Sequence, residues 1–256
     1  MAKSDYTENS QTCRGEGIRN MKNQSKKTGK HLIPVYGIVP IALALIWNTL
    51  AYNGGRWIAS GRYHYHMETV LDDKIPFVPW TVIIYFGCYL FWAVNYILIA
   101  RQDKESVYRF FTADALSRIV CFGFYVLFPT TNTRPEIVAD GFWNQIVLCL
   151  YSIDAADNLF PSIHCLVSWF CFLGIWGRKE IPKWYQYLSA GIAGCVFLST
   201  LTTKQHVLWD VAGGVLLAEL CFWLSKQGTW YRGYQKFCEG IQRWMFRLAG
   251  GMRHER

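Results

Sequence analysis

Six stretches of apolar residues alternate along the chain with polar segments rich in Lys, Arg, Asn and Pro. Each stretch is close to the roughly 20 residues that a helix needs to cross the hydrocarbon core of a bilayer. The stretches cover residues 33–52, 79–100, 107–128, 161–177, 184–201 and 206–224, and the fourth is the shortest. The pattern predicts an all-α, polytopic membrane protein built as a bundle of about six transmembrane helices.

The composition supports this interpretation. Hydrophobic residues make up 52% of the chain and charged residues 17%, whereas soluble domains carry about 25% charged residues. The net charge of +8 lies in loops and tails, as in membrane proteins, and no nucleic-acid motif accompanies it. We therefore expect the bilayer as a partner and no nucleic acid.

The distribution of cations predicts the orientation. Twenty of the 26 Lys and Arg residues lie in the two tails, in the loop after the second stretch and in the loop after the fourth. By the positive-inside rule, both termini are then cytoplasmic and the long loops 53–78 and 129–160 face outward. The predicted organisation is a disordered basic cytoplasmic tail over 1–31, a membrane domain over 32–225 and a basic cytoplasmic C-terminal tail over 226–256.

Two local features refine the bundle. Residues 142–151 are apolar but too short to span a bilayer, which predicts an interfacial helix on the outer surface. Arg118 lies in the middle of the third stretch, where a lone charge is costly. We expect Arg118 to form an ion pair with Asp114, one turn earlier, with Glu219 of the last stretch, or with both.

A histidine and an aspartate are spaced for catalysis at the outer start of the last stretch. His206 and Asp210 are four residues apart and share one face of a helix. The Asp210 carboxylate can accept the imidazole Nδ1–H, which leaves Nε2 as an exposed nucleophile. We expect His206 in the first turn of the helix, with Thr202 or Thr203 as its N-cap.

A second cluster precedes the fourth stretch, where Pro161 is expected at the first helical position and His164 in the first turn. The backbone N–H groups of such a helix start can hold a phosphate oxygen. Arg134 offers a planar fork for phosphate. Ser162 is either an oxygen ligand or a helix-start hydroxyl, and Lys204 either binds substrate or extends to the interface.

Other reactive side chains have simpler interpretations. His64 and His66 form a pair in the first outer loop without an apparent third ligand, so we predict no metal site. Most of the nine Cys residues lie within apolar stretches and are expected to be buried, small hydrophobic residues.

These motifs resemble the type 2 phosphatidic acid phosphatase superfamily of membrane lipid phosphatases and phosphotransferases over roughly residues 70–225. Arg134-Pro135 matches the end of its first motif, Pro161, Ser162 and His164 match the second, and Ser199, His206 and Asp210 match the third. The chain is most similar to a branch that includes inositol phosphorylceramide synthases and bacterial membrane phosphatases. Three positions depart from the motifs, with Leu127 in place of Lys, Ile163 of Gly and Thr200 of Arg.

The resemblance implies a mechanism without metal or other cofactor that passes through a phosphohistidine. His206 would attack phosphorus, Asp210 would orient it, and His164 would protonate the leaving alkoxide. Arg134, Ser162 and Lys204 are the expected phosphate-binding residues. The leading hypothesis is a lipid phosphatase acting at the outer membrane face. A lipid phosphotransferase with an alcohol acceptor such as inositol, and a non-catalytic anion-binding protein or transporter, remain as alternatives. The sequence leaves the lipid, the acceptor and the oligomeric state open.

Overall fold

A computed structural model describes residues 32–254, so the tail expected over 1–31 lies outside the described residues. The described chain is mostly helical, and its one sheet pairs two strands of two residues each, β1 (Tyr65–His66) and β2 (Thr130–Thr131). The prediction of an all-α polytopic membrane protein is confirmed.

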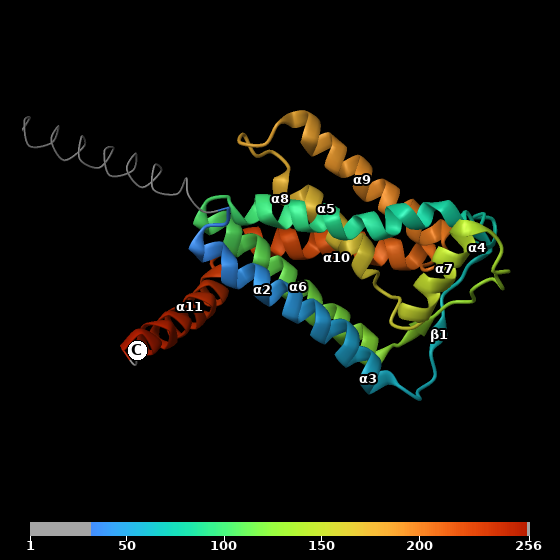
Figure 1. Ribbon diagram of the computed structural model, residues 1–256, viewed down its shortest axis with the longest axis horizontal. Helices are drawn as coiled ribbons and strands as arrows, with labels where there is room; N and C mark the ends of the chain where they lie inside the picture. Colours follow the sequence, from blue (N-terminus) through green and yellow to red (C-terminus); the bar gives the residue numbers. More distant parts are fainter. Residues whose placement is uncertain (1–31, 255–256) are drawn as a thin grey trace, which may run out of the picture.

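All six apolar stretches form helices, which run side by side as a bundle (Figure 1). The first stretch combines α2 (Val35–Thr49), a π-helical turn (Leu50–Gly54) and α3 (Gly55–Ala59). The others are α5 (Val82–Ala100), α6 (Lys104–Leu127), α8 (Ile163–Ile175), α9 (Lys183–Thr202) and α10 (Leu208–Lys226).

Four of these helical segments are long and apolar enough to cross a membrane: Val35–Ala59, Pro79–Ala100, Lys104–Leu127 and Leu208–Lys226. Two predicted spans differ. α8 has 13 residues, about 20 Å at 1.5 Å per residue, and packs against α5, α9 and α10. Because much of its surface is covered by protein, its length need not match the bilayer. α9 has 20 residues but is less apolar than the four spans.

The charge within α6 is neutralised as predicted. Arg118 Nη2 lies 2.9 Å from Asp114 Oδ1, and both side chains are buried. Tyr96 donates a hydrogen bond of 2.6 Å to the same carboxylate oxygen. Glu219, the other partner considered, instead accepts a hydrogen bond from Trp169 Nε1 at 2.8 Å. The pair with Asp114 is thus confirmed.

One end of the bundle carries the long loops, and we call it the loop end (Figure 1). It holds α4 (Val70–Asp73), the 3₁₀ turn Pro79–Thr81 and α7 (Gly141–Ile153). The segment 142–151 is therefore helical, as expected. α7 is fastened to α5 by a buried apolar cluster that contains Val82, Tyr85, Val147 and Leu150.

The C-terminal segment forms a helix that the sequence analysis did not anticipate. α11 (Tyr231–His254) packs against α6 and α2 at the end opposite the loop end and extends away from the bundle (Figure 1). Tyr231 and Cys238 are buried against Tyr108. At least the first part of the predicted tail is therefore attached to the bundle.

Candidate active site

His206 lies in a tight turn between α9 and α10. The carbonyl of Thr200 accepts hydrogen bonds from the backbone N–H groups of both Gln205 and His206, at 3.0 and 3.1 Å. α10 begins at Leu208 with Val207 as its N-cap. The expectation that His206 lies in the first helical turn, capped by Thr202 or Thr203, is therefore wrong, because the turn extends past it.

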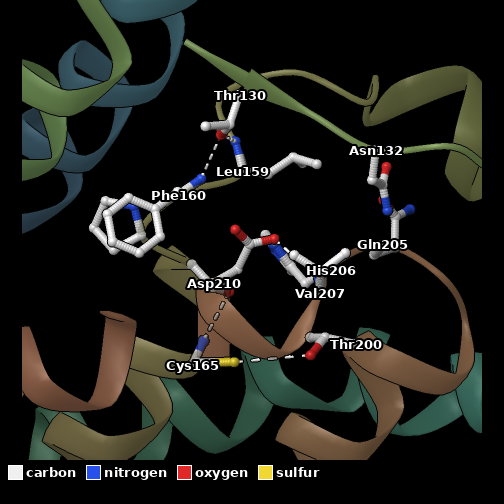
Figure 2. A network of polar contacts seen from close by, with 12 residues as sticks. Thr130, Asn132, Leu159, Phe160, Cys165, Thr200, Gln205, His206, Val207 and Asp210 are labelled. Carbon is white, nitrogen blue, oxygen red and sulfur yellow. Dashed lines mark hydrogen bonds and ion pairs between the residues drawn. The ribbon is translucent and has the colours of Figure 1, made fainter. Parts of the chain in front are cut away.

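The contact between His206 and Asp210 forms nevertheless. His206 Nδ1 lies 3.2 Å from Asp210 Oδ2, which also accepts the backbone N–H of Val207 at 3.0 Å (Figure 2). Asp210 is fully buried and His206 is 8% exposed. A carboxylate fixed at Nδ1 leaves Nε2 as the nitrogen that can react.

The second cluster lies beside the first. The backbone N–H of Ser162 donates to the carbonyl of Asp210 at 3.0 Å, which joins the start of α8 to α10. Ser162 is the N-cap, and its hydroxyl accepts the N–H of Cys165. Of the two roles considered for Ser162, the structure shows the helix-start hydroxyl. Pro161 therefore precedes the cap, instead of occupying the first helical position as expected.

His164 lies in the first turn of α8, as expected, and faces α5. Its ring centroid is 5.9 Å from that of His206. Tyr85 Oη lies 3.3 Å from His164 Nδ1, and Tyr89 Oη lies 3.4 Å from Nε2. Trp92 completes this wall, with its ring centroid 5.5 Å from that of His164. The two histidines are thus neighbours, with His164 on α8 and His206 in the turn before α10.

Arg134 enters the site from the loop after β2. Its guanidinium lies over the ring of Tyr151, 4.3 Å from the centroid, and Nη2 donates to Gln205 Oε1. Within residues 32–254, Arg134 Nε and Gln205 Nε2 are buried and have no hydrogen-bond partner. Two unpaired buried donors, one of them on the residue directly before His206, suit an anionic ligand. Burial lowers the pKa of Arg134 from its usual value.

Lys204 is bound to the first long loop. Its Nζ donates to the carbonyls of Asp72 and Ile75 at 2.9 and 2.6 Å. The Asp72 carboxylate in turn accepts the backbone N–H of Leu208 at 2.8 Å, so the loop holds the start of α10. Since an ammonium has three donors, one remains for a ligand.

Two cavities meet at His206. The first, of about 210 Å³, is lined by His164, His206, Gln205 and Asp154. The second, of about 490 Å³, is lined by His206, Arg134 and Lys204. His206 therefore lies between the cationic side chains on one side and the second histidine on the other.

Asp154 is a site residue that the sequence analysis missed. It accepts hydrogen bonds from Tyr52 at 2.5 Å and from Tyr85 at 2.7 Å. Burial raises the pKa of Asp154, but the charge of His164 and the two tyrosine hydroxyls outweigh it and hold that pKa below its usual range. The sequence contains a signal for the aromatic side chains around His164, because Tyr85, Tyr89 and Trp92 of α5 share one helical face.

The departures from the family motifs also have structural consequences. Leu127 is apolar, so the charge of the motif's Lys is absent at this position. Its side chain is 77% exposed at the end of α6. Thr200 is buried, and its hydroxyl donates to the carbonyl of Phe197 at 2.8 Å.

His64 and His66 contact Arg62 and Glu68, and among residues 32–254 no three His, Cys, Asp or Glu side chains form a potential metal site.

Comparison with protein families identifies the superfamily of the chain. The model of the PAP2 superfamily matches residues 62–224, a range that contains both histidines and Asp210. The match covers more than half of the chain, which therefore belongs to the type 2 phosphatidic acid phosphatase superfamily. Membership supports a phosphoesterase or related phosphotransferase. No curated protein and no solved structure matches the chain.

Proposed function

We propose that this protein is a membrane lipid phosphatase that hydrolyses a lipid phosphate ester through a phosphohistidine. The observation that carries the proposal is the pair of histidines, 5.9 Å apart, with Asp210 fixed behind His206. Such an arrangement provides an oriented nucleophile and a separate proton donor at one cavity.

The reaction proceeds in two steps. His206 Nε2 forms a bond to phosphorus as the bond from phosphorus to the lipid oxygen breaks, and protonated His164 transfers its proton to that oxygen. The neutral His164 then takes a proton from water, and the resulting hydroxide displaces His206 and yields inorganic phosphate. Arg134, Gln205 and Lys204 neutralise or bind the phosphate oxygens, the main source of acceleration in phosphoryl transfer.

A phosphotransferase is the second candidate, and the first cavity provides a specific observation for it. Asp157 and Asn158 line that cavity with His164, and the Oδ1 atom of each is buried without a partner among the described residues. Unpaired acceptors beside the proton-transfer residue suit the hydroxyl groups of an alcohol acceptor such as inositol, which would replace water in the second step.

The test is the phosphoenzyme itself. Purified protein incubated with a lipid monophosphate labelled with ³²P should retain acid-labile, base-stable label, and His206→Ala should abolish both label and turnover. His64→Ala removes a histidine of the first long loop outside this cluster and should retain both. Label that persists in His206→Ala would exclude His206 as the nucleophile. Products analysed with and without inositol distinguish the phosphatase from the transferase.

A further inference from the structure

An apolar groove of about 500 Å³ lies beside the first cavity, between α2, α5, α6 and α8. Its lining includes Ile41, Ala44 and Leu45 from α2, Ala93 and Ile97 from α5, and Val167 from α8. Both α2 and α5 belong to segments that can span the membrane. Leu45 is 68% exposed at the rim, so the groove opens on the surface that lipid chains surround.

The groove is continuous with the site. Asn48, Tyr89 and Trp92 line both the groove and the cavity that contains His164. Tyr89 Oη is 3.4 Å from His164 Nε2. A ligand whose phosphate lies against the histidines can therefore extend past Asn48 into the groove.

Asn48 is the polar group at the junction of the two spaces. It lies near the end of α2, directly before Thr49 and the π-helical turn, and such turns often occur at functional sites. Its Oδ1 is buried and has no hydrogen-bond partner within residues 32–254. An unpaired buried amide is costly, and its carboxamide offers both a donor and an acceptor to a ligand.

We propose that the groove binds the hydrocarbon tail of the phosphate-bearing lipid and that Asn48 hydrogen-bonds the ester or amide linkage between tail and headgroup. In such a lipid the phosphate, the polar linkage and the apolar chain follow one another. The histidines, Asn48 and the groove follow one another in the same order. This inference rests on the proposed function for the identity of the headgroup, and it adds the site that selects the lipid.

The first experiment blocks the groove. Hexadecyl phosphate and butyl phosphate carry the same reacting group on tails of different length, so the ratio of their kcat/KM values reports tail binding. Ala93→Trp and Leu45→Trp should lower this ratio at least about tenfold, because burial of even two methylenes contributes that much. The matched control is Leu216→Trp on α10, since Leu216 is also 68% exposed but lies outside the groove lining. An unchanged ratio in both groove variants would overturn the tail site.

The second experiment tests Asn48. Asn48→Leu should lower kcat/KM roughly fivefold for a monoacylglycerol phosphate, the size expected for one buried hydrogen bond. Hexadecyl phosphate, which has no linkage group, should be unaffected, and Asn48→Gln should recover part of the loss. An equal loss on both substrates would show that Asn48 supports the fold instead of contacting the lipid.

A binding measurement separates this inference from the proposed function. A hexadecyl phosphate with a photoreactive diazirine at mid-chain is crosslinked to His206→Ala protein, and the adducts are mapped by mass spectrometry. Adducts within residues 41–48 and 89–97 support the groove even if no phosphate ester is hydrolysed. Adducts spread over α9 and α10 would contradict it even if turnover is observed.

Discussion

Asp154 is linked to the second histidine through a tyrosine. Tyr85 donates its proton to Asp154 at 2.7 Å, so the Tyr85 oxygen, 3.3 Å from His164 Nδ1, is free to accept the Nδ1–H. Asp154 itself is held ionised, because the charge of His164 and two hydrogen bonds outweigh its burial and keep its pKa low. The Asp154 anion behind Tyr85 opposes the burial that lowers the pKa of His164, and it thereby favours the protonated form, which can release the leaving alcohol.

Substitutions in the chain of contacts Asp154–Tyr85–His164 should change the pH profile of kcat as well as its value. Asp154→Asn and Tyr85→Phe should each lower kcat about tenfold, less than the hundredfold or more expected for the acid itself. In Asp154→Asn the alkaline limb of the kcat profile should move to lower pH, because protonated His164 loses its counter-charge. Asp140→Asn, a carboxylate of the loop before α7, should leave both unchanged. A uniform loss of rate with an unmoved limb would indicate a structural role.

Lys204 lies where it could both anchor a loop and bind substrate, and one substitution can separate these two roles. Its ammonium anchors the first long loop through the carbonyls of Asp72 and Ile75, and it lines the cavity next to His206. A monoester carries nearly two negative charges at neutral pH and a diester one, so Lys204→Ala should reduce kcat/KM more for a lipid monophosphate than for a phosphodiester lipid. Equal reductions, together with a lower Tm, would leave Lys204 as a loop anchor alone.

At this scale the sequence predicts only what is local. The pairing of His206 with Asp210 follows from a spacing of four residues, and the structure contains it. Asp154 meets Tyr52 and Tyr85, which lie 102 and 69 positions away. No periodicity relates such residues, because their proximity depends on how the π-helical turn after α2, the helix α5 and the end of α7 pack together.

Close packing of α10 against the start of α8 brings the two histidines together. A Cβ on Gly214 would lie 2.6 Å from the backbone oxygen of Ser162, an approach that no side chain tolerates. Since Ser162 caps α8 and the N–H of Ser162 bonds to the carbonyl of Asp210, this contact fixes His164 relative to His206.

Gly214→Ala should therefore impair both stability and catalysis. Overpacking of this kind costs about 1–3 kcal/mol, and the displaced α8 should lower kcat further than the loss of folded protein explains. Gly194→Ala in α9 is the matched control, because a Cβ there has no neighbour within 4 Å in the described part of the chain and alanine favours a helix. Thermal unfolding in detergent and turnover per folded molecule are the measurements. A fully active Gly214→Ala would show that the spacing of α8 and α10 is not critical.

The apolar pattern predicted all six helices of the bundle. Its prediction of a membrane span was wrong for α8, whose neighbours are protein helices instead of lipid. α8 can be shorter than a membrane span because it packs against α5, α9 and α10. The length of about 20 residues is required only of a helix that is exposed to lipid. α11 was not predicted from the sequence, because the many cations of the C-terminal segment lower its average hydropathy. α11 gains a buried contact through Tyr231 and Cys238, which hydropathy averaged over the tail does not detect.

Among residues 32–254, the two histidines lie at one end of the bundle and most of the cations lie at the other. Lys104 pairs with Glu239 of α11 at 2.7 Å, and Arg109 donates to the carbonyl of Ser225. These contacts gather the loop between α5 and α6, the end of α10 and α11 at the end of the bundle opposite the site (Figure 1). By the positive-inside rule, we predict that the end with the cations is cytoplasmic and that the histidines face outward.

This predicted orientation determines which leaflet supplies the substrate, and reporter fusions can test it. Reporter fusions after residue 256 and within the loop 178–183 should be cytoplasmic, and a fusion at Asn132, which donates to the Lys204 carbonyl at 2.9 Å beside the site, should be external. An Asn132 fusion in the cytoplasm would reverse the assignment. The histidines and the groove between α2 and α5 would then act on lipids of the inner leaflet, since headgroup and tail sites turn over together with the bundle.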